Sequence, residues 1–267
     1  MKKFDGLLLC SDIDATLTND NNEVSRENLE AIKYFTQYGG VFTVATGRIP
    51  FTIPKVLNEF IKVPVICQNG SAIFDVHTKK YVSYKEIDRR AIEIVKDIVN
   101  NFDFVGIEYY RLFDIVFLKE NNATKRHEIE EKIPCASHLD CAIDEVEGPI
   151  IKILFAQEEA QTDVLDKALK NSPYQNEYKL LKSHPWYYEI LRKDISKGKA
   201  LKELCTLLRL DLKNVISVGD NDNDIEMIQV SGLGYATLNA TENLKNAADK
   251  ITKNNNEHAI ADVIFKI

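Results

Sequence analysis

The amino-acid sequence predicts an α/β protein: a parallel β-sheet flanked by helices, with a second α/β domain inserted into it. Short apolar runs of strand length alternate with amphipathic helical stretches near the start of the chain, and the same alternation returns over its last third. The middle of the chain follows a different order of helices and strands. We therefore expect a core of residues 1–83 and 191–267 and an inserted domain of residues 84–190.

The N-terminal part of the core begins with strands and helices in alternation. Three apolar runs end in polar residues or glycine: 6–12, 41–48 and 63–70. Residues 25–40 carry apolar side chains at helical spacing, with Ser25 suited to cap the start and two glycines to end the helix. Residues 51–61 also predict a helix, with Pro54 near its start.

The rest of the chain gives the remaining elements. In the C-terminal part of the core we expect helices over 196–210, 224–232 and 241–249 and strands over 214–222 and 233–239. In the inserted domain we expect a helix over 89–102, strands over 114–120 and 150–156, and an aromatic stretch over 184–194.

Composition and charge exclude several classes of protein. The chain has 267 residues, of which 45% are hydrophobic and 28% charged, which is typical of a globular protein. The net charge of −7, without a block of Lys and Arg, gives no basis for a nucleic-acid or membrane-surface partner. No segment has the length of a membrane helix, and none resembles a signal peptide. We expect a cytoplasmic protein.

The cysteines point to the same compartment. They are odd in number, scattered along the chain and without the CxxC spacing of a zinc site, so we expect reduced thiols: Cys10, Cys67, Cys135, Cys141 and Cys205.

Polar groups that carry chemistry follow three of the predicted strands. The first strand ends at Asp12 and Asp14, the second at Thr46-Gly47-Arg48, and a late one at Asp220, with Asn223 and Asp224 directly after it. In an open parallel sheet, ligands bind beyond the carboxyl ends of the strands. The three groups can therefore face one crevice.

Several carboxylates in a small volume are tolerated when a hard divalent cation neutralises them, and such oxygen ligands suit Mg²⁺. Mg²⁺ beside anionic groups points to phosphate chemistry. One carboxylate can act as a nucleophile that forms an aspartyl-phosphate, and a second can protonate the leaving group and later activate water. A Thr hydroxyl, backbone N–H groups, an Asn amide and a Lys can bind the phosphoryl oxygens.

Four stretches, in this order, resemble the motifs of the haloacid dehalogenase superfamily of phosphatases: DIDAT (12–16), TGR (46–48), the lysine of ISKGKAL (195–201) and GDNDND (219–224). The inserted domain and the stretches CQNGSAI and NVISVGDNDNDIEMI are most similar to the Cof-type sugar-phosphate phosphatases. The resemblance covers essentially the whole chain. It implies a Rossmann-like core with an α/β cap inserted between the second and third motifs.

The resemblance also implies roles for individual residues. Asp12 would be the nucleophile and Asp14 the general acid/base. The transferring phosphoryl group would be held by Thr46, Gly47, Lys197 and Asn223. Mg²⁺ would be bound by Asp12, by the backbone carbonyl of Asp14 and by Asp220, and Asp224 would orient Lys197 or a metal-bound water.

Two positions depart from the family pattern. Ala15 stands where the family has a glycine, which permits a positive φ, so we expect activity to survive with a slightly altered loop. The glycine that the family carries near residues 254–260 is also absent, which leaves the role of that loop open.

Some residues have a structural interpretation beside a functional one. Arg48 suits a structural salt bridge or a substrate contact equally. We expect His127 and His138 on the surface and His184 in packing. Trp186, Tyr187 and Tyr188 are expected in the core of the inserted domain, and Glu189 and the stretch 106–111 are candidate substrate contacts.

These features predict a Mg²⁺-dependent phosphatase that hydrolyses a small phosphorylated metabolite, such as a sugar phosphate. A phosphomutase or phosphotransferase, and a non-catalytic protein that binds a phosphorylated metabolite, are the alternatives. The sequence assigns neither the substrate nor the oligomeric state.

Overall fold

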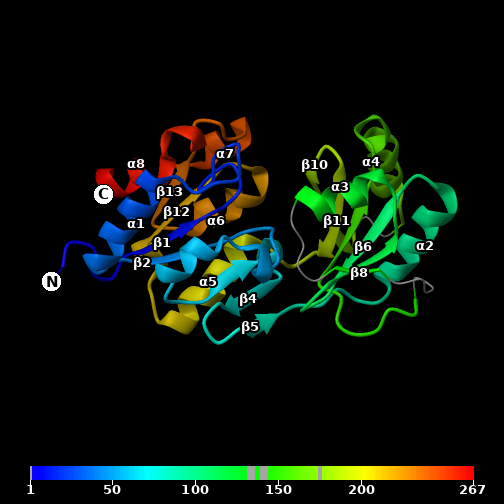
Figure 1. Ribbon diagram of the computed structural model, residues 1–267, viewed down its shortest axis with the longest axis horizontal. Helices are drawn as coiled ribbons and strands as arrows, with labels where there is room; N and C mark the ends of the chain where they lie inside the picture. Colours follow the sequence, from blue (N-terminus) through cyan, green and yellow to red (C-terminus); the bar gives the residue numbers. More distant parts are fainter. Residues whose placement is uncertain (1, 131–135, 139–143, 174–175) are drawn as a thin grey trace. The chain divides into compact units, whose positions relative to one another are not determined.

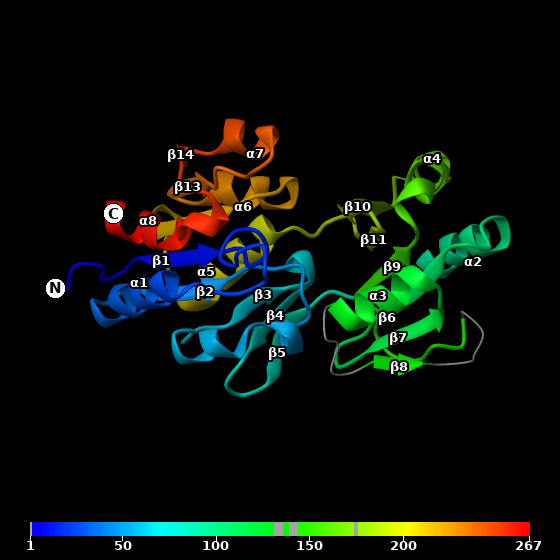
Figure 2. The ribbon, with the colours of Figure 1, turned by 45° about the horizontal axis from the view of Figure 1, so that its top comes forward.

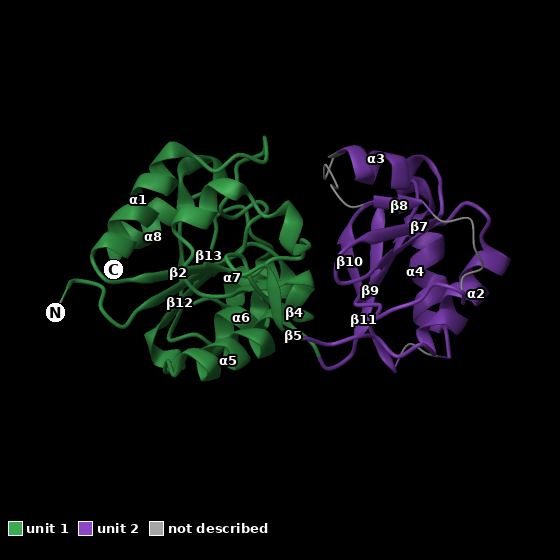
Figure 3. Cartoon of the chain, turned by 60° about the horizontal axis from the view of Figure 1, so that its bottom comes forward, with its two compact units in different colours: residues 1–83, 195–267 green, residues 84–194 purple. Residues whose placement is uncertain are grey.

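The protein folds into two compact units (Figures 1 and 3). The structure is a computed structural model, which describes residues 2–130, 136–138, 144–173 and 176–267. The first unit comprises residues 1–83 and 195–267, and the second comprises residues 84–194. The predicted fold class, an α/β core with an inserted α/β domain, is confirmed. Cys135 and Cys141 lie outside the described residues, whereas the other cysteines are buried thiols.

The described residues of the first unit form a five-stranded parallel sheet with strand order β14-β13-β12-β1-β2. Its strands are β1 (Leu8–Ser11), β2 (Val41–Val44), β12 (Val215–Gly219), β13 (Leu233–Ala236) and β14 (Lys250–Ile251). Ser11, the last residue of β1, lies opposite Val44 of β2 and Val218 of β12. Because β12, β1 and β2 run parallel, their carboxyl ends meet at one edge of the sheet.

Helices cover both faces of this sheet (Figure 2). They are α1 (Arg26–Gln37), α5 (Lys197–Leu208), α6 (Ile225–Val230), α7 (Glu242–Ala247) and α8 (Ala259–Lys266). Alternate residues of β1 point to opposite faces: Leu9 packs in the cluster formed with α1 and α8, and Leu8 packs in the cluster formed with α5 and α6. The predicted cap of α1 is confirmed, because the Ser25 side chain accepts a hydrogen bond from the Asn28 N–H.

A smaller sheet continues the first unit. It consists of β3 (Val65–Cys67), β4 (Ala72–Asp75) and β5 (Lys80–Tyr84), and a parallel bridge joins Ala45 to Ile66. The prediction of one helix over 51–61 is wrong: two 3₁₀ helices, Pro50–Thr52 and Lys55–Glu59, occupy the segment. Pro54 has no N–H to donate and disfavours a helical residue before it, and Ile53 is extended.

The second unit is built on a six-stranded sheet with strand order β10-β11-β9-β6-β7-β8. Its described elements are α2 (Ala91–Asn101), β6 (Gly106–Tyr110), β7 (Ile115–Lys119), α3 (Asn122–Glu130), β8 (Ala136–His138), β9 (Lys152–Ala156), α4 (Thr162–Asn171), β10 (Tyr178–His184) and β11 (Tyr187–Arg192). Apolar side chains of α2 and α4 share one core cluster with the sheet residues Ile107, Phe155 and Ile190. These two helices therefore cover one face of the sheet.

Within the described part of the chain, no helix combines the length and the apolar character that crossing a membrane requires.

Candidate active site

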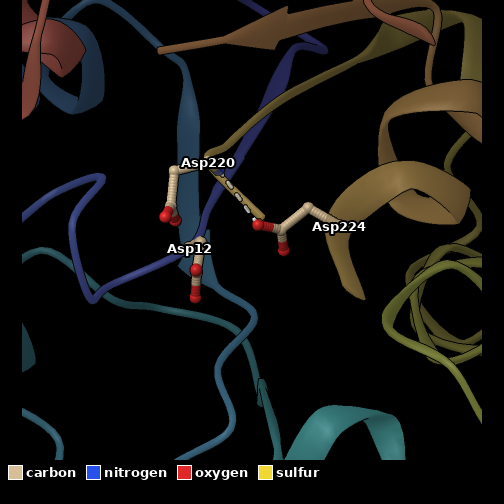
Figure 4. A group of neighbouring side chains, drawn as sticks. All are labelled: Asp12, Asp220 and Asp224. Atoms are coloured by element: carbon tan, nitrogen blue, oxygen red, sulfur yellow. Dashed lines mark hydrogen bonds between the residues drawn. The ribbon is translucent and has the colours of Figure 1, made fainter. Parts of the chain in front are cut away.

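Three aspartates meet at the edge where the carboxyl ends of β1 and β12 lie side by side (Figure 4). Asp12 follows β1 directly, Asp220 follows β12, and Asp224 ends a single 3₁₀ turn after β12. One carboxylate oxygen of each lies within 4.8 Å of the other two. The parallel register of neighbouring strands thus brings together residues about two hundred positions apart in the sequence.

Lys197 lies between two of these carboxylates. Its Nζ atom is 2.9 Å from Asp12 Oδ1 and 2.7 Å from Asp224 Oδ1. Lys197 is the first residue of α5, whose start is capped by the Ser196 side chain. Its side chain is 1% exposed, so the ammonium group is held by the carboxylates rather than by solvent.

Asp224 is fully occupied by protein donors. Its Oδ1 accepts from Lys197, and its Oδ2 accepts from the backbone N–H groups of Asp220 and Asn221. Both oxygens therefore have partners within the protein. This arrangement matches a residue that orients Lys197 and the Asp220 loop better than a direct metal ligand.

Asp220 is held from the other side by Thr16, whose hydroxyl donates to Asp220 Oδ1 at 2.9 Å. The sequence alone indicates no role for Thr16 beyond its place in the first motif. Its position four residues after Asp12, in the loop that leaves β1, was the available signal.

Burial and like charge shift the pKa values of these groups. Desolvation, and then the charge of Asp224, raises the pKa of Asp12 well above its usual range, while Lys197 opposes the shift. Desolvation and Asp224 raise the pKa of Asp220 to about 6. Burial alone would lower the pKa of Lys197, but the attraction of Asp12 and Asp224 outweighs it and raises that pKa.

Asp14 is held by Arg48, which forms a two-pronged contact with it. Arg48 Nη2 lies 2.6 Å from Asp14 Oδ1, and Nε lies 3.1 Å from each carboxylate oxygen. A further guanidinium nitrogen donates to the backbone carbonyl of Thr52. The Asp14 side chain is 48% exposed, whereas that of Arg48 is 14% exposed. Of the two interpretations of Arg48, the structure shows the salt bridge.

Thr46 and Gly47 lie just after β2, the strand that pairs with β1. The Thr46 side chain is buried, and its Oγ1 accepts from the Arg48 N–H at 3.1 Å. The hydroxyl hydrogen of Thr46 remains able to donate to a ligand. Gly47 leaves a space that is filled by Asn69, whose Oδ1 lies 3.2 Å from the place a Cβ would take.

Asn223 contacts Asn69 across the site: its Nδ2 donates to Asn69 Oδ1 at 3.0 Å. The Asn223 Oδ1 atom is buried and has no hydrogen-bond partner among the residues that the structure describes. In the sequence, the stretch around Asn69 is similar to the family, but no role is predicted for Asn69 itself. The signal for its role was the same as for the other groups: polar residues directly after a buried strand.

Ala15 adopts a φ of 52°, so the loop keeps the left-handed conformation that a glycine favours. Asn239 supports this loop, because its Nδ2 donates to the Ala15 carbonyl while its Oδ1 accepts from the Asn255 N–H. Asn255 in turn donates to the Thr18 carbonyl. The segment that lacks the family's late glycine therefore braces the loop of the first motif.

Charged residues are buried on one face of the sheet of the second unit. Lys152 of β9 forms an ion pair with Glu189 of β11 at 2.9 Å, and both are buried. Glu108 of β6 is fully buried and lies 2.8 Å from Nδ1 of His127, which α3 supplies. The prediction that His127 is on the surface is therefore wrong. The helical period of residues 122–130 is weak, so it could not show which side of α3 is covered.

The other predictions for the second unit have clear outcomes. Tyr187 and Tyr188 are buried, as expected for core aromatics, while Trp186 is partly exposed with Arg126 over its ring. His138 is exposed and contacts Glu120 and Glu128.

The carboxylate cluster fits a hard divalent cation. Its ligand atoms are all oxygens, and buried like charges raise each other's pKa, a cost that a cation between them would offset.

The described fold is an α/β core that carries a buried lysine and three clustered carboxylates, a candidate cation site, at the carboxyl edge of its sheet. The sequence pattern of the haloacid dehalogenase-like hydrolase family matches residues 9–264, and the chain belongs to this family. The predicted superfamily is thereby confirmed, and with it the class of hydrolase.

Relatives support this at the level of the whole chain. The chain is 30% identical over 261 residues to the 5-amino-6-(5-phospho-D-ribitylamino)uracil phosphatase YcsE of Bacillus subtilis, with 96% of this chain and 94% of the relative covered. Its fold is that of a haloacid dehalogenase-like hydrolase from Bacteroides thetaiotaomicron, at a TM-score of 0.86, 24% identity and 99% coverage of both chains.

The fold is also that of the HAD subclass IIB sugar phosphatase BT4131, at a TM-score of 0.83 and 21% identity, with 97% of this chain and 98% of that chain covered. These structural likenesses show the fold, and the family match shows that the chain is a haloacid dehalogenase-like hydrolase.

Proposed function

We propose that the protein is a Mg²⁺-dependent phosphatase that hydrolyses a small phosphomonoester through an aspartyl-phosphate on Asp12. The observation that carries this proposal is the position of Lys197, buried between Asp12 and Asp224 at the edge where Asp220 also lies. A buried lysine beside a buried carboxylate favours the ionised form of that carboxylate against the effect of burial, and a nucleophile requires the ionised form.

In the first step, a carboxylate oxygen of Asp12 attacks phosphorus, and the bond from phosphorus to the leaving oxygen breaks. Asp14, whose side chain is 48% exposed, donates a proton to that leaving oxygen. In the second step, Asp14 takes a proton from water as the water attacks phosphorus. The bond to Asp12 then breaks and inorganic phosphate leaves.

The phosphoryl oxygens would be held by donors near the carboxyl edge of the sheet: the Thr46 hydroxyl, the Gly47 backbone N–H, Lys197 and the second Nδ2 hydrogen of Asn223, the first being donated to Asn69. Mg²⁺ would be held by Asp12, the Asp14 carbonyl and Asp220, and it would neutralise charge on the phosphoryl group. Asp224 would keep Lys197 in place, since both of its oxygens are already engaged by protein donors.

For the substrate we propose a sugar phosphate or a metabolite of similar size. The related phosphatase from Bacillus subtilis is named for a phosphorylated ribityl compound, and the structural neighbour BT4131 is named as a sugar phosphatase. We further propose that the second unit, the inserted α/β domain, selects the substrate. Three buried thiols in the described chain agree with the proposed cytoplasmic location.

Phosphate release from p-nitrophenyl phosphate and from a panel of sugar phosphates tests the proposal. We expect hydrolysis by the wild-type protein with Mg²⁺, loss of hydrolysis in EDTA, and no turnover by Asp12→Asn. Asp222→Asn is the matched control, because Asp222 is exposed and pairs with Thr241 and Asn243. An active Asp12→Asn protein would refute the mechanism. Isomerised sugar phosphate without free phosphate would indicate a mutase instead, and binding without turnover would indicate a non-catalytic binder.

A further inference from the structure

The turn Gln68–Gly70, directly after β3, has an unusual backbone. Its three residues have positive φ angles of 51°, 58° and 94°, and only the third is a glycine. A non-glycine residue in the left-handed region is sterically strained. The Gln68 side chain adds a further cost, since it is fully buried and neither of its amide atoms has a partner within the described residues. Backbone strain of this kind is concentrated at functional sites.

The turn contacts the loop after β2, which carries Thr46 and Arg48, and it contacts the start of α5, which carries Lys197. The Asn69 N–H donates to the Thr46 carbonyl at 3.0 Å, and the Gln68 N–H donates to the Arg48 carbonyl at 3.0 Å. A Cβ on Gly70 would come within 2.2 Å of the Ser196 carbonyl, so this turn also packs directly against the start of α5. The chain can approach so closely only because residue 70 is a glycine.

The Asn69 side chain contacts Asn223, which lies in the turn after β12. It is 3% exposed and its Oδ1 accepts from Asn223 Nδ2 at 3.0 Å. An asparagine amide presents donors on one side and an acceptor on the other, and rotation by half a turn exchanges them. Because Asn69 presents an acceptor, the Asn223 amide turns its Nδ2 donor toward Asn69. The buried Oδ1 of Asn223 therefore points away from Asn69.

We propose that Asn69 is a positioning residue that sets the orientation of the Asn223 amide and couples it to the Thr46–Gly47 turn. Its left-handed backbone brings the side chain over Gly47, where the absence of a Cβ leaves room for it. The left-handed turn therefore allows the short Asn69 side chain to contact both Gly47 and Asn223. This inference rests on the proposed function for its readout, because Asn223 matters to rate only if the site is catalytic.

Asn69→Gly tests the side chain without disturbing the backbone, because glycine adopts the same positive φ at no steric cost. We expect kcat for p-nitrophenyl phosphate to fall about 5- to 10-fold, the loss that corresponds to one net hydrogen bond, with KM changed less than about twofold. Asn22→Gly is the matched control: Asn22 has a φ of 60°, is exposed, and lies in the turn before α1. It should leave both constants unchanged.

A double-mutant cycle distinguishes positioning from a purely structural role. If Asn69 acts through Asn223, then Asn69→Gly should have no further effect on kcat in an Asn223→Ala background. Independent, multiplicative losses would overturn the proposal, and so would wild-type kinetics in Asn69→Gly. Failure of the proposed function is seen separately, because it would leave Asp12→Asn as active as the wild type.

Discussion

Lys197 Nζ lies 2.9 Å from Asp12 Oδ1, and both side chains are buried. A buried ion pair gives little net stability by itself, but removing one partner leaves an uncompensated charge in a low-dielectric interior. Here the loss of Lys197 would leave three neighbouring carboxylates without a compensating positive charge: those of Asp12, Asp220 and Asp224.

Lys197→Met should lower kcat/KM by about 100-fold or more, because it removes a donor from the phosphoryl site. It should also lower the free energy of unfolding of the metal-free protein by about 3 kcal/mol, the cost of unpaired buried carboxylates. Urea denaturation and phosphate release measure the two effects. Lys199→Met, on the exposed side of the same helix, is the control, and an equal loss in both variants would contradict the assignment.

The stability of the metal-free protein should increase as pH falls from 7 toward 5. The pKa of Asp220 is raised to about 6 by desolvation and by Asp224, so below that pH the folded protein binds more protons than the unfolded chain. The free energy of unfolding then falls as pH rises through this window. Because Mg²⁺ binds the ionised carboxylates, the rise in Tm that it causes should be larger at pH 7.5 than at pH 5. A rise in Tm that is independent of pH would argue against binding at Asp220.

Arg48→Met should affect substrates according to their leaving group. Arg48 holds the Asp14 carboxylate, and protonation by Asp14 matters most when the leaving oxygen is strongly basic. We expect kcat/KM to fall about 10-fold or more for alkyl phosphates, and less than about threefold for p-nitrophenyl phosphate. Arg26→Met, which removes an exposed pair with Glu30, should change neither value. Equal losses for both substrate types would show that Arg48 does not act through Asp14.

Ala15→Gly should raise the free energy of unfolding by about 1 kcal/mol, because glycine relieves the positive φ of 52°. The gain is reduced by the greater freedom of glycine in the unfolded chain. Asn22→Gly should give a smaller change, since asparagine tolerates the left-handed region better than alanine does. Urea denaturation with a shared m-value measures both, and a destabilised Ala15→Gly protein would show that the loop is not strained.

The sequence predicted the elements of the core well, except where one residue changed the local rule. The apolar runs before Asp12, Thr46 and Asp220 are strands, and Ser25 caps the helix expected of it. The helix expected around Pro54 is two short 3₁₀ turns, because proline outweighed the apolar period. In the second unit, the weak period of α3 hid the burial of His127.

By itself, the sequence determined which residue types gather at the carboxyl edge of the sheet, because strand ends and parallel order are local patterns that repeat along the chain. The tertiary structure alone decided how those residues pair. Arg48 meets Asp14 over 34 positions, and Asn223 meets Asn69 over 154. Such contacts depend on the register of neighbouring strands and on the close approach of turns at Gly47 and Gly70. Burial and charge then act on the pairs, and no periodicity along the chain encodes them.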